Sequence, residues 1–326
     1  MEQEKKLHDV GIDVSKEKLD VALLREQGKF RDKVVANTRK GFEELRAWLA
    51  KQGVTGAHVC MEATGSYWEE LAEFLVDAGF EVSVVNPALI RKYSESLGER
   101  SKTDRIDARV IAKFCAERRP EAWQAPSKAV RNLRALVRRR EALVELRTEE
   151  LNRRDSASEP RVLESIEKVI AHLDEQIARI DKQIRDHIDG DSTLKEQRKL
   201  LQTVPGIGKV VSAMLLSYYG GELRFATSNQ AVAFAGLDTS RRESGTSVRS
   251  KPRMSKKGHS NIRGTLYMPA VVAMTRTAWG KAFSSRLAKA GKPPMVIIGA
   301  VMRKLVAIAY GILKSGQSFN PALHAA

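Results

Sequence analysis

The sequence predicts an α/β fold for its first 125 residues and a mostly α-helical structure for the remainder of its 326 residues. Three observations support this prediction. Short runs of alternating apolar residues, which are typical of strands, lie between residues 8 and 85, and helical patterns separate the later ones. Residues 166–184 instead repeat apolar side chains in the 4-3 spacing of a coiled coil. Two further helical patterns cover residues 259–290 and 294–314.

The N-terminal elements follow a recognisable order. The expected strands are Asp9–Val14, Leu19–Leu24, Lys33–Ala36, Ala57–Met61 and Phe80–Val85. The expected helices are Gly41–Gln52, Tyr67–Ala78, Ala88–Leu97 and Thr103–Glu117. Three strands followed by helix–strand–helix–strand–helix is the element order of the ribonuclease-H-like fold, in which the later strands pair in parallel through crossover helices.

The middle of the chain predicts a helical hairpin. A long charged helix, Ala129–Asp155, is followed by a break at residues 156–160 and a second helix. The seam of that second helix comprises Ile166, Ile170, Leu173, Ile177, Ile180 and Ile184. The seam can pair within the hairpin or with a second subunit, and we expect self-association into a dimer or tetramer. Domain boundaries are expected near residues 125 and 195.

The charge of the chain is unevenly distributed. The net charge is +16, and residues 201–326 carry 18 Lys and Arg against 3 Asp and Glu. This asymmetry favours a polyanionic partner, above all nucleic acid, over a merely solubilising surface. Cys60 and Cys115 belong to no C-x-x-C or Cys/His motif, so neither a zinc site nor a disulfide framework is expected.

The sequence favours a cytoplasmic, nucleoid-associated protein with no membrane association. The N-terminus is polar and charged and shows no signal peptide. The apolar run 295–313 is interrupted by Arg303 and Lys304, and therefore predicts a buried helix and not a membrane span.

Four acidic residues form a candidate metal site. Asp13 lies in the middle of an apolar strand, where an unpaired carboxylate is costly, and Glu62 ends the strand expected beside it. Asp104 and Asp107 have the i, i+3 spacing that places both carboxylates on one helix face. Such a set suits Mg²⁺, with Mn²⁺ as a possible substitute. Asp104 and Glu62 also have an ordinary interpretation as helix-terminal residues, and Asp107 as a partner of a nearby arginine. Asp13 has the weakest ordinary interpretation, because its strand position offers no helix cap to make.

Two basic features follow in the last third. Pro205-Gly206-Ile207-Gly208-Lys209 predicts the turn of a helix-hairpin-helix, in which Gly206, Gly208 and Lys209 contact a DNA backbone; an ordinary helix–helix turn is the alternative. Residues 241–260 predict a flexible loop for phosphate binding. Its expected nucleic-acid contacts are Arg241, Arg242, Arg249, Lys251, Arg253, Lys256 and Lys257. A serine in this segment, such as Ser244, either contacts phosphate or acts as a nucleophile, and the residues alone favour the first.

These motifs, taken together and in order, resemble the DEDD transposases of bacterial insertion sequences, a group that includes Piv-like invertases and bridge-RNA-guided recombinases. The resemblance spans essentially the whole chain. It rests on residues 11–17, Glu62-Ala63-Thr64-Gly65, residues 102–109, Pro205-Gly206-Ile207-Gly208, Arg242-Glu243-Ser244-Gly245 and residues 310–313.

The resemblance implies a RuvC-type domain (residues 1–125) whose Mg²⁺-binding catalytic tetrad is Asp13, Glu62, Asp104 and Asp107. It implies a coiled-coil insertion (126–195) and a basic transposase domain (196–326) in which Ser244 attacks a DNA phosphate and forms a covalent intermediate. A noncoding guide RNA would pair with double-stranded donor and target DNA, and the protein would act as a homo-oligomer.

Two other functions are compatible with the residues. One is a RuvC-like, structure-specific endonuclease that uses the acids and a metal-activated water. The other is a non-enzymatic nucleic-acid-binding protein, which would account for the basic last third but not for the four acids.

Overall fold

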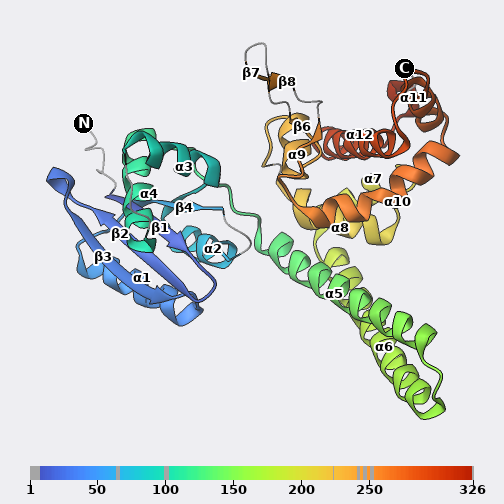
Figure 1. Cartoon of the computed structure of the whole chain (residues 1–326), viewed down its shortest axis with the longest axis horizontal. Coiled ribbons are helices and arrows are strands. Elements are labelled where there is room, and N and C mark those ends of the chain that lie inside the picture. Colours follow the sequence, from blue (N-terminus) through green and yellow to red (C-terminus); the bar gives the residue numbers. More distant parts are fainter. Residues whose placement is uncertain are drawn as a thin grey trace. The chain divides into compact units, whose positions relative to one another are not determined.

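A computed structural model of the chain describes residues 8–63, 67–98, 103–222, 224–240, 243–244, 248–249 and 253–324. Contacts divide the chain into two compact units, Met1–Ala125 and Pro126–Ala326 (Figure 1). The three domains expected from the sequence, with boundaries near residues 125 and 195, stay a prediction.

The N-terminal unit is built on a five-stranded mixed sheet. Its strands are β1 (His8–Val14), β2 (Lys18–Leu24), β3 (Phe30–Ala36), β4 (Ala57–Glu62) and β5 (Glu81–Val85). The spatial order is β3-β2-β1-β4-β5. Strand β2 pairs antiparallel with both β1 and β3, whereas β4 pairs parallel with both β1 and β5. The five strands and the parallel pairing predicted from the sequence are confirmed.

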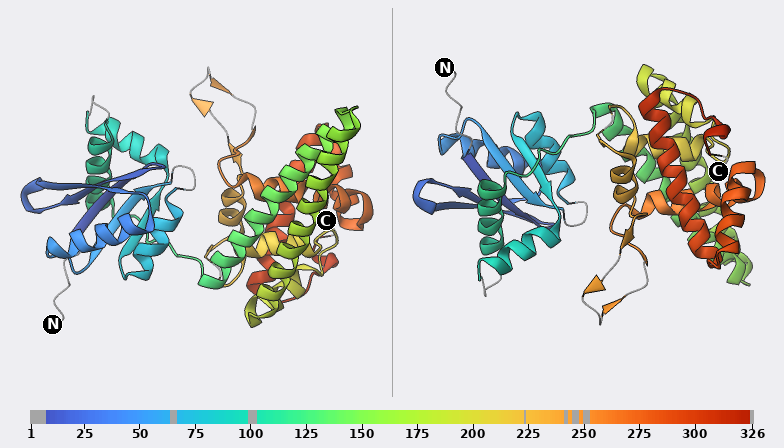
Figure 2. Two further views of the ribbon diagram at one scale, coloured as in Figure 1. Left: turned by 90° about the horizontal axis from the view of Figure 1, so that it is seen from below. Right: turned by 90° about the horizontal axis from the view of Figure 1, so that it is seen from above.

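Helices cover both faces of this sheet (Figure 2). Helices α1 (Arg39–Lys51) and α2 (Glu69–Asp77) pack with Val10, Ile12 and Val14 of β1 in one apolar core. Helices α3 (Pro87–Ser96) and α4 (Asp104–Arg118) pack on the opposite face. Because strand side chains alternate, Gly11 and Asp13 face α4.

The C-terminal unit begins with the predicted helical hairpin. Helices α5 (Lys128–Ser156) and α6 (Pro160–Asp189) lie side by side, and Arg140 of α5 binds Asp181 of α6 at 2.6 Å (Figure 1). The seam of α6 packs on α5 of the same chain, with Leu173 and Ile184 buried. The pairing within one hairpin is therefore present, and self-association stays a proposal.

The remaining helices share one apolar core with the base of the hairpin. They are α7 (Ser192–Leu201), α8 (Lys209–Tyr219), α9 (Ser228–Phe234), α10 (Ser260–Arg276), α11 (Ala278–Lys289) and α12 (Pro294–Ser315). The single helix predicted over residues 259–290 is wrong, because extended backbone at Thr277 ends α10 and its hydroxyl caps α11.

Helix α12 is, within the part of the chain that the structure describes, long and apolar enough to cross a membrane by length and composition. Most of its apolar side chains are buried in the core of the C-terminal unit. That burial agrees with the buried core helix that the sequence predicts for this segment.

Candidate active site

The register of β1 and β4 places Asp13 beside Glu62. The two strands are parallel and their paired residues extend to Ile12 and Met61, so Asp13 and Glu62 are the next positions on each strand. Both side chains leave the sheet on the face that α4 covers, because Gly11 and Cys60, two residues earlier, face that helix. Two carboxylates of the predicted tetrad therefore lie at the carboxyl end of adjacent parallel strands.

Helix α4 begins with the other two acids. The Thr103 hydroxyl accepts a hydrogen bond from the backbone N–H of Ile106 at 3.3 Å and so caps the helix. Asp104 and Asp107 consequently stand in the first turn, where the helix dipole favours negative charge.

Close backbone packing brings this first turn to the sheet. A Cβ on Gly11 would lie 2.2 Å from Ala108 O and 2.2 Å from Ala112 N, so only glycine lets α4 approach β1 this closely. The far end of α4 reaches the start of β1, where Arg119 binds Asp9 at 2.7 Å. The helix therefore runs opposite to β1, and its acidic first turn lies at the end of β1 that carries Asp13.

The electrostatics of Asp13 show that the acids converge. Burial, and after it the charges of Asp107, Asp104, Glu62 and Asp20, together raise the pKa of Asp13 to about 6. All three remaining members of the predicted tetrad thus act on one half-buried carboxyl group. Such concentrated negative charge is a suitable environment for a cation.

A lysine already interacts with this negative cluster. Lys18 binds Asp104 at 2.8 Å and Asp20 at 3.0 Å, and these two hydrogen bonds, that to Asp104 first, raise the pKa of Lys18. Asp20 is a further acid of the cluster that sequence reasoning missed. It is buried and pairs across β1 and β2 with Asp13, a position that follows only once the register of the hairpin is known.

The donor set of the acid cluster fits a hard divalent cation. Carboxylate oxygens, supplemented by water and substrate phosphates, are the ligands that Mg²⁺ and Mn²⁺ prefer. Among the described residues, the ligand atoms of His58, Cys60 and Cys115 all lie within 4.8 Å of one another. The oxygens of the four acids do not form such a group, so they are spaced more widely. No sequence motif reveals this group of Cys60, Cys115 and His58, because it forms only on folding.

The glycine turn connects two helices, as predicted. It joins α7 to α8, with Val204 and Ile207 buried and Gly208 and Lys209 exposed. Gly206 has a φ of +93°, a conformation that strongly favours glycine. Gly208 precedes α8 without a side-chain cap, and a Cβ there would meet nothing within 4 Å. The first turn of α8 is thus exposed and has no side-chain cap on its backbone N–H groups.

The predicted basic loop contains strand pairs. Strands β6 (Thr239–Ser240) and β9 (Arg253–Met254) pair, as do β7 (Glu243–Ser244) and β8 (Val248–Arg249), which makes the segment a ribbon in its described parts. The backbone of Ser244 pairs with that of Val248.

The basic side chains of this ribbon are placed only in part. Arg253, Lys256 and Lys257 are exposed. Arg241, Arg242 and Lys251 lie outside the described residues, and Arg249 is located by its backbone in β8.

The base of the ribbon is anchored to its unit. The backbone N–H of Lys256 donates to Gly236 O at 3.1 Å, and Arg263 donates to Ala235 O at 2.9 Å and to Gly258 O at 3.0 Å. These hydrogen bonds hold residues 256–258, which follow β9, against the backbone at the end of α9.

Comparisons with known proteins agree with this arrangement. Residues 10–157 match a family model described as a transposase, of the DEDD IS110 type, and residues 198–285 match the transposase IS116/IS110/IS902 family. The chain is 32% identical over 318 residues to a pilin gene-inverting protein of Moraxella bovis, covering 97% of this chain and 98% of that protein. The chain belongs to the IS116/IS110/IS902 family of transposases.

Other relatives support the same assignment. A pilin gene-inverting protein of Moraxella lacunata is likewise 32% identical over 318 residues, with 97% of this chain and 98% of that protein covered. A 43.6 kDa protein of insertion element IS110 from Streptomyces coelicolor is 21% identical over 126 residues, or 39% of this chain and 31% of its own.

Membership of this transposase family identifies the chain as a DNA recombinase, and implies DNA substrates and a divalent metal. The first family match spans the acid cluster, and the second spans the glycine turn and the ribbon with Ser244. The two features of the transposase that sequence reasoning linked to DNA chemistry therefore lie in different matched regions.

Proposed function

We propose that this transposase is the recombinase of an insertion sequence, directed to double-stranded donor and target DNA by a noncoding bridge RNA. Asp13, Glu62, Asp104 and Asp107 would hold Mg²⁺, or Mn²⁺ in its place, and Ser244 would be the nucleophile. The observation that carries the proposal is the convergence of Asp107, Asp104 and Glu62 on the half-buried Asp13. Burial first, and then these charges, raise the pKa of Asp13 to about 6.

The close arrangement of the four acids is best explained if they bind a cation. Neutralising several clustered carboxylates with a cation removes a repulsion that the fold otherwise bears. A bound Mg²⁺ would polarise the scissile phosphate and stabilise the charge that develops on it. The four residues would orient the reacting phosphate, and Lys18 would leave Asp104 as the cation enters.

The serine step conserves bonds and protons. Ser244 Oγ would bond to the phosphorus of a DNA phosphodiester while the bond from phosphorus to a deoxyribose oxygen breaks. The serine proton would pass through a base to the departing oxygen, which leaves as a free hydroxyl. The hydroxyl of a second DNA end would then displace Ser244 and restore the serine, so no external energy source is needed.

Several features support DNA and RNA as partners in a cytoplasmic, nucleoid-associated setting. The charge excess of residues 201–326, the exposed N-terminus of α8 and the exposed cations at residues 253–257 suit phosphate backbones, which carry no sequence information. A protein surface of this kind fits a mechanism in which a guide RNA, by pairing with the DNA, selects the DNA sequence. A homo-oligomer, dimer or tetramer, would allow two DNA ends to be held together.

Two alternatives use the same acids. A RuvC-like endonuclease would need only the acid cluster and a water nucleophile. Site-specific inversion of a resident DNA segment is suggested by the names of the two Moraxella relatives. Inversion and transposition share strand exchange, whereas the endonuclease does not rejoin strands.

A trapping experiment tests the serine proposal. End-labelled donor DNA is incubated with wild-type protein, Ser244→Ala and Asp13→Asn, then denatured and resolved on a gel. A covalent adduct with the wild type alone supports the proposal. Cleavage that persists in Ser244→Ala without any adduct favours the endonuclease and overturns the serine route.

A second experiment tests the RNA. The protein is purified with and without ribonuclease treatment, and any bound RNA is sequenced. An enriched RNA whose segments match DNA at the ends of the element supports guidance. Recombination that survives complete removal of RNA contradicts it.

A further inference from the structure

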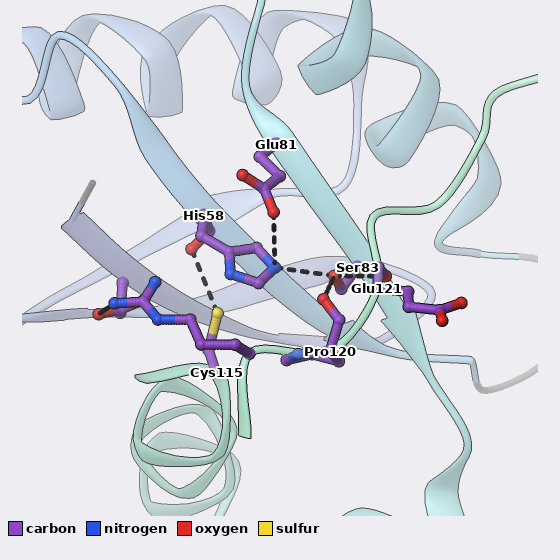
Figure 3. Close-up of polar contacts among 8 residues, drawn as sticks. His58, Glu81, Ser83, Cys115, Pro120 and Glu121 are labelled. Atoms are coloured by element: carbon purple, nitrogen blue, oxygen red, sulfur yellow. Dashed lines mark hydrogen bonds and ion pairs between the residues drawn. The ribbon is translucent and has the colours of Figure 1, made fainter. Parts of the chain in front are cut away.

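A second cluster of metal-ligand side chains lies under the other end of α4. It consists of His58 and Cys60 from β4 and Cys115 from α4, whose ligand atoms all lie within 4.8 Å of one another. All three side chains are almost completely buried. Figure 3 shows the sulfur of Cys115 beside the imidazole of His58, on the side away from Ser83.

Hydrogen bonds fix the imidazole of His58 in a form suited to metal binding. Its Nε2 lies 2.8 Å from Ser83 Oγ, and that hydroxyl lies 2.9 Å from Pro120 O and 2.8 Å from Glu121 O (Figure 3). The single hydroxyl hydrogen goes to one of these carbonyls, so Ser83 accepts from Nε2–H. The lone pair of Nδ1 is then free to face the thiols, as in metal sites whose second ring nitrogen is held by an outer partner.

The donor atoms select a different ion from that of the acid cluster. Two sulfurs and an imidazole nitrogen are the ligands of Zn²⁺, whereas Mg²⁺ requires oxygen. The carboxylate of Asp9, a residue that pairs with His58 across β1 and β4, lies near the cluster, and Arg119 holds it at 2.7 Å. The Asp9 carboxylate lies outside the set of ligand atoms that are within 4.8 Å of one another, so it would have to move toward the other three to serve as a fourth, oxygen ligand.

We propose that His58, Cys60 and Cys115, with Asp9 as the fourth ligand, form a buried structural Zn²⁺ site. Binding releases one proton from each thiol, and both sulfurs coordinate as thiolates. Four protein ligands leave no open position, which is the arrangement of structural and not catalytic zinc.

The site would fix the position of α4 on the sheet. Cys115 lies on the helix that carries Asp104 and Asp107, and His58 and Cys60 lie on the strand that ends at Glu62. Zinc would join this helix and strand at one end, while the acid cluster forms at the other. The zinc site does not depend on the proposed nucleophile or guide RNA.

Metal analysis of the full-length protein tests the site. Untagged protein from zinc-supplemented cells is dialysed against a weak chelator, and zinc is measured by mass spectrometry. We expect about one zinc per chain in the wild type and less than about a tenth of that in Cys60→Ala/Cys115→Ala. Glu81→Gln is the matched control, because the exposed Glu81 approaches the same His58 ring at 3.8 Å but is not a ligand; its zinc content stays at the wild-type level.

Further measurements keep the test decisive if the double variant fails to fold. Wild-type protein produced with Co²⁺ should show a thiolate-to-cobalt charge-transfer band, and Ser83→Ala should lower metal affinity about 10- to 100-fold. Zinc in the wild type no higher than in the double variant, no such band, or a disulfide between the two cysteines found by denaturing thiol titration would each overturn the proposal.

Discussion

A Cβ atom added to Gly11 would lie 2.2 Å from the backbone nitrogen of Ala112, so β1 and α4 meet backbone to backbone at this point. This contact sets the distance between α4 and the sheet. The acidic first turn of α4 depends on it, since Asp104 and Asp107 are carried on the same rigid helix.

Gly11→Ala should therefore lower the stability of the N-terminal unit and displace the acids. Overpacking a tight backbone contact costs about 1–3 kcal/mol, and we expect a decrease of that size in the free energy of unfolding, with recombination strongly reduced. Denaturant titration measures the first effect. Gly264→Ala is the control, because a Cβ there meets nothing within 4 Å in helix α10 and should be neutral or stabilising. Equal stability of wild type and Gly11→Ala would contradict the packing argument.

The raised pKa of Asp13 predicts an unusual dependence of stability on pH. Its folded pKa of about 6 exceeds its ordinary value of 3.8, so ionising Asp13 opposes folding. This penalty is absent below pH 4, grows between pH 4 and 6, and reaches about 2–3 kcal/mol above pH 6 in metal-free protein.

Asp13→Asn removes that penalty. Without divalent metal, the variant should gain stability relative to the wild type as the pH rises from 4 to 7, as measured by denaturant titration at several pH values. Adding Mg²⁺ should stabilise the wild type and leave the variant unchanged. A constant difference between the two proteins across this range would show that Asp13 lies in no such cluster.

Lys18 competes with a cation for Asp104. It binds Asp104 at 2.8 Å and Asp20 at 3.0 Å, so removing its charge leaves these acids more negative. Lys18→Met should raise the affinity of the acid cluster for Mn²⁺ severalfold in calorimetric titration. Lys16→Met, an exposed neighbour, should change it little. Weaker Mn²⁺ binding in Lys18→Met would mean that the lysine supports the metal site.

Lys209 should contribute to DNA binding without sequence preference. It is exposed in the first turn of α8, beside the glycine turn. Lys209→Gln should weaken binding to unrelated duplexes to a similar extent and reduce the slope of log affinity against log salt by about 1. Lys195→Gln, exposed on α7, is the matched control. An unchanged slope in Lys209→Gln would indicate an ordinary helix–helix turn.

The sequence predicted the acid cluster because two local patterns determined it. Alternation along β1 placed the side chain of Asp13 on the other face of the sheet from that of Ile12, and the i, i+3 spacing placed Asp104 and Asp107 on one helix face. Asp20 was missed because its place beside Asp13 depends on strand register, which no local pattern reveals.

Features formed by residues that are distant in the chain could not be predicted from local sequence patterns. His58 and Cys115 are far apart in the chain and meet only because α4 packs across β4. The break at Thr277 was missed because apolar residues continue on both sides, while a single capping hydroxyl ends one helix and begins the next.

Four carboxylates of the N-terminal unit are proposed to share a divalent cation, and direct measurement of Mn²⁺ binding tests this proposal. Electron paramagnetic resonance of the full-length protein measures free Mn²⁺ for wild type, Asp13→Asn, Asp107→Asn and the exposed control Asp155→Asn. We predict that both cluster variants bind Mn²⁺ at least about tenfold more weakly than wild type and the control. Wild-type affinity in Asp13→Asn and Asp107→Asn would contradict the account.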